Sequence, residues 1–216
     1  MIRPVLLAML ALLSTACTGT RKLVDPTLRV QTESGVELGV STQYGVVFLG
    51  RTARSGFVEI EAYFGDGPTW ETSVIEPLGG GLYTAETEIR LPSVPLKFHD
   101  PRKGEVLELR GRNAEGAWRR NVVVRADERV LGLLIDVPPE LVDAPDQVGA
   151  GLYWRNPSAP EDIRLVGLVA GRVRLERDGR ERSYLAVEGA RSLWRLVIHR
   201  RDHNKRKPPI YREDIL

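Results

Sequence analysis

Cysteine is the scarcest feature of this 216-residue chain, which has one, Cys17. A single cysteine excludes a disulfide within the chain and a cysteine-rich metal cluster. Long hydrophobic runs are also lacking, since the most apolar stretch covers only residues 5–13. A helix that crosses a bilayer needs about 20 apolar residues, so the sequence predicts no transmembrane span.

Catalytic motifs are lacking as well. The sequence has no G-x-S-x-G elbow, no P-loop and no G-x-G-x-x-G between a strand and a helix. Of its three histidines, His99 is followed by Asp100, but adjacent side chains on an extended strand point apart. His199 and His203 have a helical i,i+4 spacing without an evident third ligand. We therefore predict no catalytic site, no metal, no small-molecule substrate and a protein that is not an enzyme.

The composition is that of a folded protein, with 42% hydrophobic and 28% charged residues and a net charge of +2. The N-terminus reads as an export signal, in which Arg3 precedes the apolar run 5–13 and small residues lead to Cys17. An exported protein without a strong positive charge is not expected to bind nucleic acid.

The segment Leu13-Ser14-Thr15-Ala16-Cys17 resembles the lipobox of bacterial lipoprotein precursors. The leucine stands four residues before the cysteine, whereas three is the commonest spacing. The resemblance implies cleavage between Ala16 and Cys17, a signal peptide over 1–16, and a covalent lipid on Cys17 as the sole cofactor. Thr18, where an aspartate often favours inner-membrane retention, indicates the outer membrane. Residues 17–35 would then be a tether.

Period-two alternation dominates the next part of the chain. In Phe57–Phe64, Val58, Ile60, Ala62 and Phe64 share one face, which predicts a half-buried strand. Further strands are expected at 69–77, 82–91, 104–112 and 117–126, with turns at 65–68, 79–81 and 113–116. Residues 36–127 resemble an immunoglobulin-like domain. The predicted fold class is therefore all-β, an antiparallel sandwich followed by a second small β-unit.

That second β-unit is expected over residues 128–202. The run 163–176 alternates, and Asp178-Gly179 is typical of a tight hairpin turn to a strand at 182–189. Residues 190–201 fit either a strand or a short helix, and 203–216 are expected to form a basic extended tail.

The stretch GAGLYWRNPSAPEDIRLVGLVAG, residues 149–171, resembles the part of trypsin-like proteases that follows their serine nucleophile. Where that family has its serine, this chain has Gln147-Val148-Gly149-Ala150-Gly151, and His99 comes too late in the chain for the family's base. The resemblance implies a degenerate double-barrel protein without a recognisable triad. This and a hydrolase with an unseen site are the alternatives to a binding protein.

Two sets of side chains suggest partner contacts. Trp70, Trp118, Trp154 and Trp194 are either core residues or exposed anchors. A basic cluster is either a solubilising tail or a contact with anionic lipid or an acidic partner, and it comprises Arg200, Arg201, Lys205, Arg206 and Lys207. The sequence favours a lipid-anchored, non-catalytic envelope protein that binds the membrane through its lipid and docks to another envelope protein.

Overall fold

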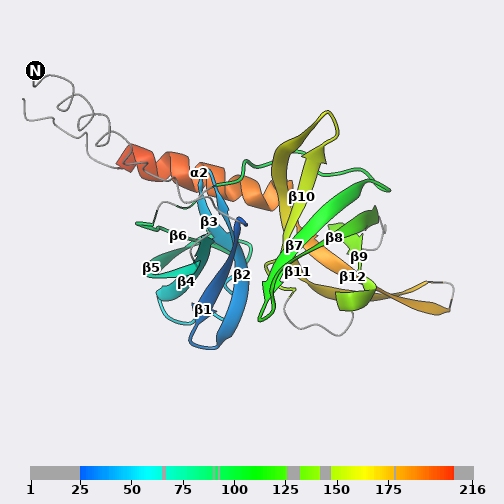
Figure 1. Ribbon diagram of the computed structural model, residues 1–216, viewed down its shortest axis with the longest axis horizontal. Coiled ribbons are helices and arrows are strands. Elements are labelled where there is room, and N and C mark those ends of the chain that lie inside the picture. The colour runs from blue at the N-terminus through cyan, green and yellow to red at the C-terminus, as the bar shows by residue number, and fades with distance from the viewer. Residues whose placement is uncertain are drawn as a thin grey trace, which may run out of the picture.

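The computed structural model describes residues 25–64, 67–89, 91, 93–125, 132–141, 147–177 and 179–206. Two antiparallel β-barrels lie side by side, and a long helix near the C-terminal end packs beside them (Figure 1). The predicted lipid site at Ala16 and Cys17, and Lys207 of the basic cluster, lie outside the described residues.

The first barrel closes in the order β1-β2-β3-β6-β5-β4. Its strands are β1 (Thr27–Thr32), β2 (Gly35–Thr42), β3 (Gly45–Phe48), β4 (Phe57–Phe64), β5 (Gly67–Gly79) and β6 (Leu82–Ala85). Val58, Ile60, Ala62 and Phe64 point into its core as the alternation of β4 predicts. They pack there against Leu28, Val30 and Phe48.

The second barrel closes in the order β10-β11-β12-β9-β8-β7. Its strands are β7 (Val106–Asn113), β8 (Gly116–Arg125), β9 (Leu133–Asp136), β10 (Gly151–Asn156), β11 (Ala159–Arg177) and β12 (Arg180–Glu188). A 3-10 helix, η1 (Pro139–Leu141), follows β9. The hairpin of β11 and β12 extends beyond the barrel as an arm (Figure 1), and its turn holds Gly179 at φ +69°.

The segment between the barrels and the helix α2 (Ala190–Arg206) join the two units. Leu165 donates its N–H to Pro95 O, and Lys97 donates to Leu165 O, both at 2.8 Å. Leu193 and Leu196 of α2 are fully buried in an apolar cluster that draws residues from both barrels. Among the described residues, no helix is long and apolar enough to span a membrane.

The prediction of an all-β, antiparallel protein is confirmed. The strands close into two barrels, however, instead of packing as a sandwich with a smaller unit. The first barrel ends at Ala85 and the second begins at Val106, so the boundary lies inside the segment expected to form one domain. Alternation fixes which residues face inward, and it is the same for a sandwich and for a barrel.

The C-terminal segment is a helix, where the sequence left strand and helix open. Leu193, Leu196 and Val197 pack toward the barrels, and the helix runs on to Arg206, into the segment expected as an extended tail. Asp100 accepts a hydrogen bond from the N–H of Ala190 at 3.1 Å. This cap satisfies one of the free N–H groups at the helix start.

Candidate functional site between the two barrels

The loop before β10 touches the first barrel directly. Leu38 of β2 donates its N–H to Val148 O at 3.1 Å. Gly149 has φ +84°, and a Cβ on it would lie 1.9 Å from Leu38 O. A side chain there would both strain the backbone and separate the barrels, so this contact requires glycine.

The same loop is held on its other side by β11. Gly149 donates to Val169 O at 2.8 Å, and Val169 donates to Ala150 O at 2.9 Å. Gln147 is buried and donates from its side chain to Leu141 O. The loop is therefore fixed between the barrels, and the segment that resembles the protease nucleophile loop presents Val148 and no serine.

The loop between β3 and β4 also reaches the second barrel. Arg51 is exposed, and its Nη1 lies 3.2 Å from where a Cβ on Gly171 of β11 would stand. The next residue, Thr52, donates its backbone N–H and its hydroxyl to Oε1 of the buried Glu37. A buried carboxylate of β2 thus fixes the loop that presents Arg51 to the second barrel.

A pocket of about 200 Å³ opens where β1 and β2 meet the turn of the β7–β8 hairpin. Its polar side chains are Arg29, Glu37, Arg112 and Asn113, and its apolar side chains are Val36, Leu38, Ala114 and Val148. It therefore borders the fixed loop at Val148 and combines charged groups of both signs with apolar walls.

Both cations that line this pocket, Arg29 and Arg112, belong to a cluster around Tyr63. Arg29 pairs with Glu61 at 3.1 Å, and the Arg112 guanidinium lies 3.4 Å from the centre of the Tyr63 ring. Burial raises the pKa of the Tyr63 hydroxyl, and its hydrogen bond to Glu61 adds to that rise. Tyr63 therefore stays neutral and offers its ring to Arg112.

A second charged layer lies under the cleft. Tyr153 of β10 is fully buried, and burial, with the charge of Asp25 adding to it, raises the pKa of its hydroxyl. Arg110 lies 4.9 Å from the ring centre of Tyr153 and pairs with Glu108. Burial alone would raise the pKa of Glu108, but hydrogen bonds from Arg155 and Arg110 and their charges lower it. The single carboxylate of Glu108 thus serves both arginines of this layer.

The sequence indicates that these charged residues lie on one strand face, but not that this face is buried. Glu108, Arg110 and Arg112 alternate along β7 and so share one face. The pattern gives no sign that the other barrel covers that face, so Glu37, Arg110 and Arg112 were missed as site residues.

The three histidines do not gather with a serine and a carboxylate. His99 is exposed in the segment between the barrels, and its neighbour Asp100 caps α2. Ser192, near the start of α2, donates its hydroxyl to the Glu188 carboxylate at 2.7 Å and not to a histidine. His199 lies 3.1 Å from Glu76 and His203 3.4 Å from Glu86, which fastens α2 to the first barrel. No group of three His, Cys, Asp or Glu side chains suited to a metal occurs in the described part of the chain.

The predicted basic cluster is divided by the helix. Arg200 turns toward the first barrel and lies 3.4 Å from Glu86, whereas Arg201 lies 3.3 Å from Asp202. Lys205 and Arg206 form the end of α2. The tryptophans divide too: Trp118 and Trp154 pack against the core of the second barrel, while Trp70 and Trp194 are about half exposed, at 50% and 46%.

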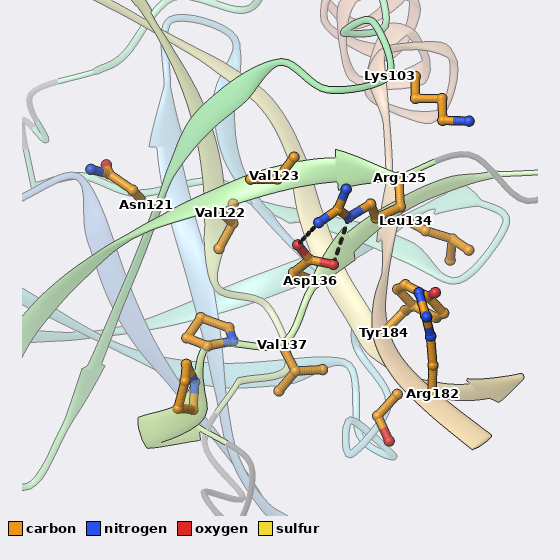
Figure 2. Close-up of a pocket in the computed structure, with 13 residues that line it drawn as sticks. Lys103, Asn121, Val122, Val123, Arg125, Leu134, Asp136, Val137, Arg182 and Tyr184 are labelled. Atoms are coloured by element: carbon orange, nitrogen blue, oxygen red, sulfur yellow. Dashed lines mark hydrogen bonds and ion pairs between the residues drawn. The ribbon is translucent and has the colours of Figure 1, made fainter. Parts of the chain in front are cut away.

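A larger hollow of about 730 Å³ lies on the second barrel over β8, β9 and β12. Figure 2 shows its main ion pair, in which Arg125 donates to both carboxylate oxygens of Asp136, at 2.8 and 2.7 Å. This arginine is therefore already neutralised, while two further cations, Lys103 and Arg182, also line the hollow.

No family model matches the chain, and no curated protein matches its sequence. Solved structures match its fold. The MamO protease domain from Magnetospirillum magneticum is 15% identical with a TM-score of 0.53, over 81% of this chain and 95% of that one. The serine protease of human pathogenic astrovirus is 11% identical with a TM-score of 0.51, over 76% and 90%. Kallikrein-related peptidase 10 is 9% identical with a TM-score of 0.58, over 82% and 96%.

This likeness confirms the double-barrel alternative at the level of fold. It contradicts the prediction that the chain is not an enzyme, because the fold it shares is that of serine proteases. The prediction rested on missing sequence motifs, and a catalytic group is defined by its place in a fold and not by a motif. At these identities the comparison shows the fold alone: the chain has the double β-barrel of serine proteases.

Proposed function

We propose that this chain is a lipid-anchored protein of the bacterial envelope that takes up an extended polypeptide segment between its two barrels. The observation that carries the proposal is a strand edge left open beside the cleft. β10 pairs with β11 only as far as Leu168, and the loop before β10 bonds to Val169. From Ala170 onward, this edge of β11 pairs with no strand that the structure describes.

An open strand edge is a template for an added strand, because its N–H and C=O groups lack partners. β12 covers the opposite edge of β11 as far as Arg177. Gly171 has no side chain to block an incoming backbone, and the exposed Arg51 stands beside it. The open edge therefore suits a peptide that extends the sheet.

Peptide hydrolysis is the second candidate function, favoured by the serine proteases that share the fold. Binding and cleavage can be separated in one experiment. The full chain carrying Cys17→Ser, which prevents lipidation, is incubated with a pool of random decapeptides. Hydrogen exchange is followed by mass spectrometry, and the same samples are searched for cleaved peptides.

We expect exchange to slow at residues 170–176 and to stay unchanged at the β4–β5 hairpin, whose strands already pair with each other. Cleaved decapeptides in these samples would support the second candidate. Unchanged exchange over 170–176 at saturating peptide, with the pool intact, would overturn both.

The lipid anchor is part of the proposal and has its own test. Cells that express the chain are labelled with a tagged fatty acid, and the membranes are separated. We expect label on the wild type in the outer-membrane fraction and none on Cys17→Ser. Persistent label on the variant would rule out Cys17 as the anchor. Crosslinking in native membranes would then identify the expected envelope partner.

A further inference from the structure

A buried cation in the pocket between the barrels has no acidic partner within the described part of the chain. Arg112, near the end of β7, is only 9% exposed. Its guanidinium makes no hydrogen bond or ion pair with any residue that the structure describes, and its Nε is buried without a partner. Its one polar contact is the face of the Tyr63 ring. Arginine stays charged in proteins, so this is a buried positive charge.

The neighbouring arginines show how unusual this is. Arg110, two residues earlier on the same face, pairs with Glu108, and Arg29 in the same pocket pairs with Glu61. A buried charge without a counter-ion is costly, and an aromatic face offsets only part of that cost. No described residue supplies the counter-ion of Arg112, so the arrangement suits an anionic ligand.

The pocket is suited to one residue of a peptide. At about 200 Å³ it is below the usual range of cofactor and drug sites, about 300–1,000 Å³. Val36, Leu38 and Val148 give it apolar walls. Glu37 also lines it, with Oε1 engaged by Thr52 and Oε2 buried without a partner. The pocket thus calls for a carboxylate toward Arg112 and an N–H donor toward Glu37.

The strand direction selects which end of a peptide arrives there. Every pair of strands in the second barrel is antiparallel. A segment that pairs antiparallel with the open edge of β11 runs toward Val169 and the fixed loop. Its carboxyl end is therefore the end that reaches Val148, which borders the pocket.

We propose that the pocket between the barrels binds the carboxylate at the end of a polypeptide, with Arg112 as its counter-ion and the last side chain against the apolar wall. This inference rests on the proposed uptake of a peptide in the cleft and names the group that is recognised. A carboxylate of an acidic side chain has the same chemistry, and the test separates the two sources.

The test uses the full chain with Cys17→Ser and fluorescein-labelled Ala-Ala-Ala-Ala-Leu, labelled at its amino end and read by fluorescence polarisation. The peptide is used with a free carboxylate, as a C-terminal amide, and as an amide that ends in Glu instead of Leu. Charge-assisted hydrogen bonds are stronger than neutral ones, so we expect the Leu amide to bind about tenfold more weakly than the free acid. Arg112→Gln should abolish this preference, whereas Arg182→Gln, an exposed change on β12, should keep it.

Equal binding of the free acid and the Leu amide to the wild type would overturn the proposal, as would a preference that survives in Arg112→Gln. Full binding of the Glu amide would support a carboxylate site but overturn its assignment to the chain end. If the amides slow exchange at residues 170–176 as much as the free acid does, the proposed function stands and this inference fails. If no peptide slows that exchange, both fail.

Thermal unfolding separates a ligand site from a merely structural contact. Removing an unpaired buried charge relieves desolvation, so Arg112→Met should unfold no lower than the wild type and gain no stability from the free acid. The wild type should gain stability from that peptide. A loss in Arg112→Met as large as that in Arg110→Met, with unchanged preference for the free acid, would make Arg112 a structural contact only.

Discussion

The two strands of the β7–β8 hairpin carry arginines on the same outer face, but the arginine on β7 is buried and the one on β8 is exposed to solvent. Arg110 of β7 stands directly opposite Arg119 of β8. Arg110 is 5% exposed, with Glu108 as its ion-pair partner, whereas Arg119 is exposed. The first barrel packs over β7, where Arg112 meets Tyr63, and leaves β8 open.

The difference teaches that one strand face can be part surface and part interface. On the open part, charge keeps the barrel soluble and needs no partner. On the covered part, each charge needs a partner. Arg110 has its partner in Glu108, whereas Arg112 has no acidic partner among the residues that the structure describes, which makes the covered face the place to look for a ligand.

Glu108→Gln should give the largest effect. It removes the charge that neutralises Arg110 and leaves that guanidinium buried. We expect a loss of about 3 kcal/mol in the free energy of unfolding, as is typical when one partner of a buried pair is lost, measured by urea denaturation. Asp162→Asn is the control, because it removes the acid of an exposed pair with Arg164. A loss no larger than that of Asp162→Asn would mean that water reaches the Glu108–Arg110 pair on the covered face.

Gly149→Ala tests the contact between the loop before β10 and the first barrel. Its Cβ would overlap Leu38 O, and its φ of +84° is unfavourable for alanine. We expect a loss of about 2–3 kcal/mol in unfolding free energy. Gly179→Ala is the matched control, since Gly179 has φ +69° with nothing within 4 Å of its Cβ position; it should lose only about 1 kcal/mol. Equal losses would show that the barrels are not held together at this loop.

The contribution of Glu108 should depend on pH. Its folded pKa lies below the ordinary glutamate value of 4.5, so the stability it provides is fully present above that value and is lost as pH falls through the folded pKa. The stability gap between the wild type and Glu108→Gln should therefore narrow below about pH 4.5. Denaturation of both proteins across this range checks it, and a constant gap would contradict an ion pair at this position.

Arg119→Gln should give the smallest effect. The side chain is exposed on the open strand, opposite the buried Arg110, and exposed substitutions usually change stability little. Its thermal midpoint should match that of the wild type. A drop comparable to that of Arg110→Met would mean that both strands of the hairpin are covered on this face, and the contrast between Arg110 and Arg119 would then be lost.

Local sequence patterns gave correct results wherever the deciding contacts were local. The strand at Phe57–Phe64, the turns at Gly79–Gly81 and at Asn113–Gly116, and the hairpin at Gly179 all lie where alternation and turn residues put them. The segment 190–201 was undecided because the same apolar residues fit both periods. Burial of Leu193 and Leu196 against both barrels settles it as a helix.

The candidate site was harder to predict from the sequence than the strands were. The resemblance of 149–171 to trypsin-like proteases led to the right fold, but it stood only as an alternative because the serine and an early histidine were missing. Arg112 could not be singled out, because one arginine in an alternating strand is like any other until its surroundings are known.

The sequence by itself determined the all-β class, the inward face of most strands and the positions of several turns, because these depend on neighbours close along the chain. It also carries the predicted lipid site at Cys17. Only the tertiary structure decided that the sheets close into two barrels, that β11 keeps an open edge, and that the first barrel covers Arg112. Those outcomes depend on residues far apart in the chain, such as Leu38 with Val148 and Tyr63 with Arg112, and no local pattern encodes such distant contacts.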